Sequence, residues 1–108
     1  MLGDLRLRVL LFRQADDVWV AQVLEHDMAA HGPNEYAALA AVQLVLQAHV
    51  NFDTRLQRPP LSRLQAAPAE FWDAYNHAEP LRMPDETPIF QPAHIVAAVS
   101  KDPVQRAH

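Results

Sequence analysis

The chain contains no cysteine and only two glycines among its 108 residues. The lack of cysteine excludes disulfides, thiolate metal sites and thiol nucleophiles, and it agrees with a reducing, cytoplasmic location. Gly3 and Gly32 lie too far apart to form a glycine-rich phosphate loop. Neither serine, Ser62 or Ser100, lies in the Gly-x-Ser-x-Gly turn that presents a serine nucleophile.

Positive charge is also scarce, since one lysine and eight arginines face 13 acidic residues and leave a net charge of −4. This balance disfavours nucleic-acid binding by this chain alone, because phosphate affinity comes mainly from clusters of basic residues. The sequence has no run of about 18 apolar residues, so we expect no membrane partner and no spanning helix. We also expect no secretory signal, because the first residues lack a long apolar stretch.

Half of the residues are apolar and a fifth are charged, as in an ordinary globular protein. The length predicts a single domain, residues 1–108, whose core needs neither a metal nor a disulfide. Eight of the nine prolines lie at or after Pro59. We therefore expect a regular core over residues 5–58 and a proline-rich extension over residues 59–108.

Strand-like alternation dominates the first thirty residues. Residues 5–13 place leucine and valine on one face, which predicts a strand. Residues 18–25 are apolar on both faces, which is typical of a central strand covered on two sides. The polar segment 14–17 suits a tight turn between them, and residues 28–31 form a candidate third strand that ends at Gly32.

A long helix should follow, from about residue 35 to residue 52. Asn34 is a good N-cap, because its side-chain oxygen can accept a first-turn N–H. The helix carries one thin polar stripe, formed by Gln43, Gln47 and Asn51, and is otherwise mostly apolar. A helix on an open sheet usually has a broader polar face. We therefore expect either the second half of the chain or a second subunit to cover it.

The second half should contain a shorter helix over residues 68–79, an extended connector through Pro84, Pro88 and Pro92, and a late strand over residues 94–100. The whole chain is then predicted to be α+β, with the order β-β-β-α-α-β. The expected sheet is antiparallel, has three to four strands, and carries one long helix packed on it.

Three stretches of the first half together form a pattern known from another protein family. They are residues 19–25 (Trp-Val-Ala-Gln-Val-Leu-Glu), Asp27 with Met28, and Gly32 through Leu39. This pattern resembles the HicB-like antitoxin family over roughly residues 5–52, about half of the chain. The resemblance implies a partial ribonuclease-H-like fold, in which a three-stranded antiparallel meander precedes a long helix and a further strand.

The resemblance also implies a non-catalytic function. The chain would be the antitoxin of a type II toxin–antitoxin pair that masks a small basic RNA-cleaving toxin, or an orphan relative of such antitoxins. The sequence departs from the family at the turn after the second strand, where Asp27 and Met28 remain but the prolines and glycine are missing. The tail has few basic residues (Arg82, Lys101, Arg106) and no helix pair, so we expect no operator binding.

Glu25, His26, Asp27 and His31 form the most polar cluster and could ligate zinc. Successive strand residues point to opposite faces, however, so we favour an ordinary surface loop. Only Glu25 and Asp27 are close enough to act together, which is too few carboxylates for a two-metal nuclease site. We predict no catalytic, cofactor-binding or metal-ligating residues, and we predict that the chain is not an enzyme.

Two further groups have ordinary explanations. His49 lies one turn before Asp53, a spacing typical of an exposed electrostatic contact. Phe71, Trp72 and Tyr75 could form an aromatic platform for a ligand, but core packing that covers the long helix is the favoured interpretation.

The sequence thus favours a HicB-like protein-interaction domain that forms a homodimer or a higher homo-oligomer. The alternative is a small-molecule or peptide-binding module, with a pocket between the long helix and the second half of the chain. The residues predicted to contact a partner or a second copy are Trp19, Glu25, His26, Asp27, His31, Phe71, Trp72 and Tyr75.

Overall fold

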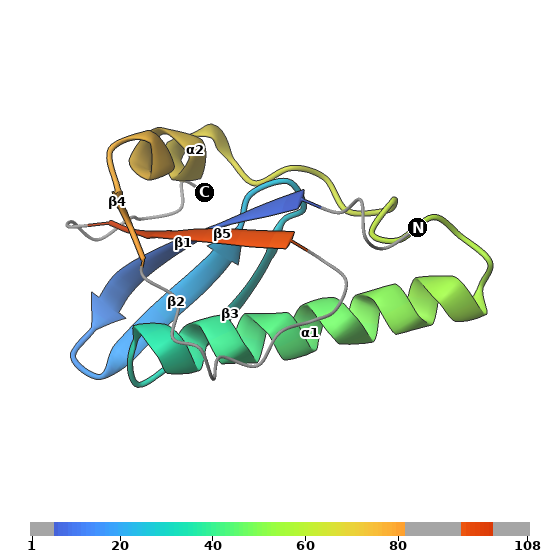
Figure 1. Cartoon of the computed structure of the whole chain (residues 1–108), viewed down its shortest axis with the longest axis horizontal. Coiled ribbons are helices and arrows are strands. Elements are labelled where there is room, and N and C mark those ends of the chain that lie inside the picture. Colours follow the sequence, from blue (N-terminus) through green and yellow to red (C-terminus); the bar gives the residue numbers. More distant parts are fainter. Residues whose placement is uncertain (1–5, 82–93, 101–108) are drawn as a thin grey trace.

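A computed structural model describes residues 6–81 and 94–100, which form five strands and two helices. The first three strands, β1 (Arg6–Ala15), β2 (Val18–Val23) and β3 (Met28–Gly32), form the predicted antiparallel meander (Figure 1). The β1–β2 turn contains no glycine; instead Asp17 adopts the left-handed conformation, with φ of 60°. Aspartate tolerates this conformation better than most residues, so the hairpin closes in two residues.

Two further strands complete a mixed sheet in the order β3-β2-β1-β5-β4. The late strand was predicted, and it is β5 (His94–Val99). It runs parallel to β1, so the prediction of a purely antiparallel sheet is wrong, and the sheet has five strands where three to four were expected. The two-residue strand β4 (Glu79–Pro80) pairs antiparallel with β5 at the sheet edge. Side-chain alternation reveals a strand but not its direction, because both directions have the same period of two.

The long helix α1 (Glu35–Arg55) begins as predicted, since the Asn34 side chain accepts a hydrogen bond of 2.9 Å from the Ala37 N–H. The end of β3 lies directly against this first turn. A Cβ atom added to Gly32 would lie 2.8 Å from the Ala38 nitrogen and 2.9 Å from the Ala37 carbonyl carbon. Glycine therefore permits a close approach that any side chain would prevent.

α1 packs across β1, β2 and β3 on one face of the sheet and closes the larger of two cores. The larger core consists of Leu7, Val9, Leu11, Ala21, Val23, Met28, Ala38, Leu39, Val42, Leu46, Val50, Leu61 and Ala97. The second half of the chain contributes Leu61 and Ala97 to this core and so covers part of α1. Cover by the second half was one of the two alternatives expected, the other being cover by a second subunit.

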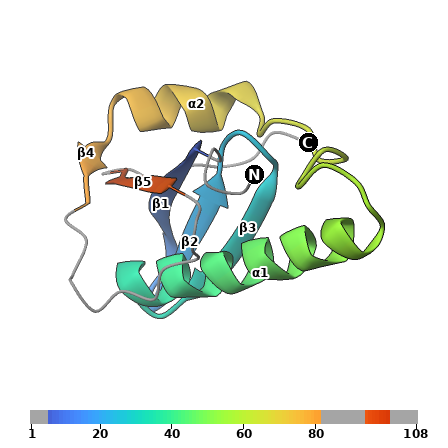
Figure 2. The same cartoon turned by 45° about the vertical axis from the view of Figure 1, so that its right-hand side comes forward.

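The short helix α2 (Ala69–Asn76) lies on the other face of the sheet, opposite α1 (Figure 2). Phe71 is buried in a second core with Leu10, Phe12 and Leu24, and its ring centroid lies 5.8 Å from that of Phe12. The prediction that Phe71 and its aromatic neighbours cover α1 is therefore wrong. The two apolar faces predicted for residues 18–25 explain the difference, because the face turned away from α1 also needs a cover.

Candidate interaction surface

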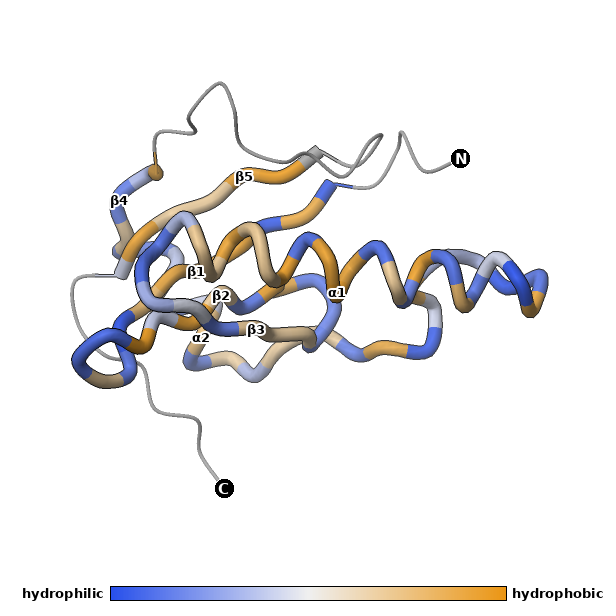
Figure 3. The backbone as a smooth tube through the Cα atoms, turned by 90° about the horizontal axis from the view of Figure 1, so that it is seen from below, coloured by the Kyte–Doolittle hydropathy of each residue, from blue (hydrophilic) through white to orange (hydrophobic). Residues whose placement is uncertain are grey.

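The outer face of α1 exposes large apolar side chains to solvent. Tyr36 is 43% exposed, Leu44 69%, Phe52 51% and Leu56 50%. Ala40 and Ala48 lie between them at the same four-residue spacing, so the six residues form one continuous row along the helix. We call Tyr36, Ala40, Leu44, Ala48, Phe52 and Leu56 the α1 ridge. Figure 3 shows apolar residues recurring along the whole of α1.

The polar stripe predicted for α1 is only partly on the solvent side. Gln47 and Asn51 are exposed, but Gln43 is only 4% exposed. The Gln43 Oε1 atom is buried and has no hydrogen-bond partner among the described residues. The polarity of a side chain therefore did not indicate its orientation here, and Leu44 faces solvent beside a buried glutamine.

The C-terminal end of α1 is fixed by a buried carboxylate, Asp53. Its oxygens accept hydrogen bonds from the Leu61 N–H at 2.8 Å, from Arg63 Nε at 3.0 Å and from Arg58 Nη2 at 3.1 Å. Burial alone would raise the pKa of Asp53, but the Leu61 N–H and the two guanidinium groups outweigh it and lower the pKa. The carboxylate thus ties the segment after α1 to the last turn of the helix.

The exposed contact predicted between His49 and Asp53 is wrong. Asp53 points inward, and His49 Nδ1 instead lies 2.9 Å from Arg63 Nη2. The segment after the helix makes this possible by folding back, with the buried Leu61 in the left-handed conformation at φ of 63°. That conformation costs a leucine about 1–2 kcal/mol, and the hydrogen bond to Asp53 and the burial of its side chain offset the cost.

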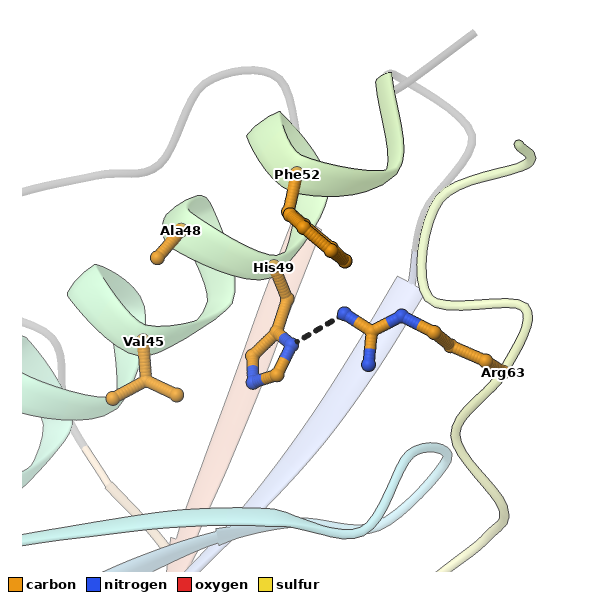
Figure 4. A pocket seen from close by; sticks show the side chains of 5 residues that line it. All are labelled: Val45, Ala48, His49, Phe52 and Arg63. Atoms are coloured by element: carbon orange, nitrogen blue, oxygen red, sulfur yellow. Dashed lines mark hydrogen bonds between the residues drawn. The ribbon is translucent and has the colours of Figure 1, made fainter. Parts of the chain in front are cut away.

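A pocket of about 420 Å³ opens beside the ridge, between α1 and this returning segment (Figure 4). Its walls are Val45, Ala48, His49 and Phe52 from α1, with Arg63 on the opposite side. The Arg63 guanidinium also lies 5.1 Å from the centre of the Phe52 ring. Asp53 is shared between Arg58 and Arg63 and neutralises only one of them, so the pocket combines apolar walls with a positive charge on one side.

The residues singled out from the sequence do not form one surface. Glu25, Trp72 and Tyr75 gather around Arg8 on the α2 side of the sheet. Glu25 accepts a hydrogen bond of 2.8 Å from the Arg8 N–H, and the Arg8 guanidinium lies 5.1 Å from the centre of the Trp72 ring. Burial raises the pKa of Tyr75. These contacts fasten α2 to the sheet.

The other predicted residues lie elsewhere. His26 and Asp27 hold the β2–β3 turn: His26 Nδ1 lies 3.4 Å from the Leu64 carbonyl oxygen, and the Asp27 carboxylate accepts a 2.9 Å hydrogen bond from Gln22. Trp19 packs against the larger core, on the α1 side of the sheet. His31 is exposed on the edge strand β3.

Sequence reasoning missed the α1 ridge and the Asp53 cluster. A signal for the ridge was present, because residues 36–52 contain no aspartate, glutamate, lysine or arginine. In the described ranges, 6–81 and 94–100, no group of three or more histidines and carboxylates is placed to hold a metal ion. No helix within those same ranges is long and apolar enough to cross a membrane.

Comparisons with family models, with curated proteins and with solved structures give no match for this chain. Four of the five exposed large apolar side chains that the structure describes lie on the α1 ridge, and the pocket adjoins it.

Proposed function

We propose that this chain is a non-catalytic, HicB-like protein-interaction domain that acts in the cytoplasm and binds its partner through the α1 ridge. The observation that carries the proposal is the combination of exposure and missing charge. Leu44 and Phe52 are more than half exposed, yet residues 36–52 hold no acidic or basic side chain apart from His49. The centres of protein interfaces are depleted of charge and enriched in aromatic residues in the same way.

Within this proposal, the first partner to test is a small basic RNA-cleaving toxin. The resemblance of residues 19–39 to HicB-like antitoxins supports this choice, as does the order β1-β2-β3-α1 followed by β5. The net charge of −4 favours association with a basic protein, because opposite charges accelerate encounter and suppress wrong partners.

The test is affinity capture from the native host with the tagged full chain, beside its Leu44→Glu variant. We expect the wild type to retain a small basic protein in stoichiometric amount and the variant to lose it. The captured protein should cleave RNA, and adding the wild-type chain should inhibit the cleavage. A captured toxin that binds both forms equally would show that the ridge is not the binding surface.

A second candidate function, the binding of a peptide or small molecule, is supported by the pocket of about 420 Å³ beside Arg63. The pocket lies between α1 and Arg63 of the second half of the chain, and its volume lies in the range of ligand sites. Chemical shifts of the His49 ring, followed by NMR during titration with short apolar carboxylates, would test it. Unchanged shifts at saturating ligand would reject this function.

A further inference from the structure

A projection and a recess lie one turn apart on α1. Leu44 is the most exposed of the large apolar side chains in the described residues, at 69%. Ala48, one turn later, has a side chain too small to fill its site and forms part of the pocket with Val45, His49 and Phe52. A surface that carries a projection and a matching recess side by side can complement a copy of itself.

We propose that the partner on the α1 ridge is a second copy of this chain, paired through antiparallel α1 helices. The twofold axis passes midway between Leu44 and Ala48. Leu44 of each copy then enters the pocket beside Ala48 of the other copy, and both insertions occur together. This inference rests on the proposed function, in which the ridge is the interaction surface, and it names a second copy in place of the toxin as the occupant of that surface.

The alternation of large and small residues along the ridge fits this arrangement. About that axis, Leu44 of one copy faces Ala48 of the other, and Phe52 faces Ala40. Rows of residues at four-residue spacing commonly pack against each other when two helices cross at about −50°. In the antiparallel pair, large side chains thus meet alanines near the crossing. In a parallel pair with the same residue of each copy opposed, Leu44 would instead meet Leu44.

Charge favours the same orientation. Residues 36–52 contain no aspartate, glutamate, lysine or arginine, and Arg63 at the pocket is already paired with Asp53, so pairing buries no unpaired charge. The residues that flank this stretch, Glu35 and Arg55, have opposite signs. In an antiparallel pair, the end of one helix that carries Glu35 lies on the same side as the end of the other that carries Arg55, which gives a weak long-range preference over the parallel pair.

One helix face is a small contact, so we expect a reversible dimer with a dissociation constant of roughly 1–100 µM. Sedimentation velocity on the full chain over about 1–500 µM would cover this range. Leu44→Glu should raise the dissociation constant at least about tenfold, because it places a charge in a centre that has none. Gln65→Glu, which adds the same charge at an exposed loop position, is the matched control and should leave it unchanged.

The pairing register is tested by exchanging charges. Leu44→Glu and Ala48→Lys should each weaken the dimer alone, and together they should restore it, because each acid then faces a lysine of the other copy. A second readout uses the absence of cysteine. The double variant Leu44→Cys, Ala48→Cys should form a disulfide-linked dimer on oxidation, and Leu44→Cys alone should not. Leu44 is exposed, so circular dichroism should show the same fold in all of these variants.

A chain that stays monomeric at every concentration would overturn the inference. A dimer that is insensitive to Leu44→Glu, or one that the charge exchange does not restore, would overturn it as well. If a monomeric wild type binds a different protein through Leu44, the proposed function stands and this inference fails. If the dimer forms with the predicted register but no other protein is captured, this inference stands and the toxin partner is rejected.

Discussion

The attachment of α2 should depend on one side chain, Phe71. It is the one buried residue of this eight-residue helix, and it contacts Phe12 in the smaller core. A helix of two turns is not stable alone in water, so α2 exists because it is docked. Phe71→Ala removes the ring and should destabilise the fold by about 3–5 kcal/mol, the usual range for a buried phenylalanine.

This loss is a large part of the stability of a domain this size, which is typically about 5–15 kcal/mol. At roughly 4–8 °C per kcal/mol, we expect the melting temperature of Phe71→Ala to fall by about 12 °C or more. Circular dichroism during heating measures this fall. Tyr75→Phe, which keeps a ring on the same helix, is the control and should change the melting temperature little.

Hydrogen exchange then locates the damage. The core under α1 shares no buried residue with the core under α2. Amides of α2 should therefore lose most of their protection in Phe71→Ala, while amides in the middle of α1 keep more of theirs. A fall in melting temperature of only a few degrees, or equal loss of protection in both helices, would refute this reasoning.

Three other perturbations test separate contacts. Gly32→Ala should destabilise the fold by about 1–3 kcal/mol in urea unfolding, because the new Cβ would collide with the backbone at Ala38. The pKa of Asp53 is lowered below its ordinary value of 3.8, so its ionised form stabilises the fold above that pH and the contribution is lost as the pH falls through the folded-state pKa. Asp53→Asn should lower the melting temperature at pH 7, and it should reduce the fall of the melting temperature as the pH is lowered into the acid range. An acid-range fall as large as that of the wild type would contradict this role. The pKa of Tyr75 is raised above 10.0, so the neutral phenol stabilises the fold below pH 10 and this contribution is lost as the pH rises. Absorbance titration should show a tyrosine ionising at a pH above 10.0, and Tyr75→Phe should remove that step.

Much of the fold could be predicted because its signals are local. The two-sided apolar pattern of residues 18–25 correctly placed β2 in the interior of the sheet, between β1 and β3. Asn34 marked the start of α1, since capping depends on residues within one turn. The late strand was also evident, because residues 94–100 form a short apolar run after a series of prolines.

The predictions that were wrong concern relations between distant segments. Side-chain alternation cannot reveal that β5 runs parallel to β1. The aromatic residues of α2 likewise do not indicate which face of the sheet they pack on. Asp53 looked like a surface residue because its partners, Arg58 and Arg63, follow in an irregular segment whose path depends on Leu61. The narrow polar stripe of α1 predicts that most of the helix is covered, although Leu44 is exposed.

The position of β5 sets the order in which the fold can be completed during synthesis. Its residues leave the ribosome after those of β1, β2, β3 and α1, yet the strand takes a place between β1 and β4 in the sheet order. Until it arrives, the hydrogen-bonding edge of β1 is open, and this strand carries Leu7, Val9 and Leu11. Open apolar edges are templates for unwanted pairing. A ribosome that stalls before residue 94 would therefore hold a nascent chain that is exposed to aggregation and in need of a chaperone.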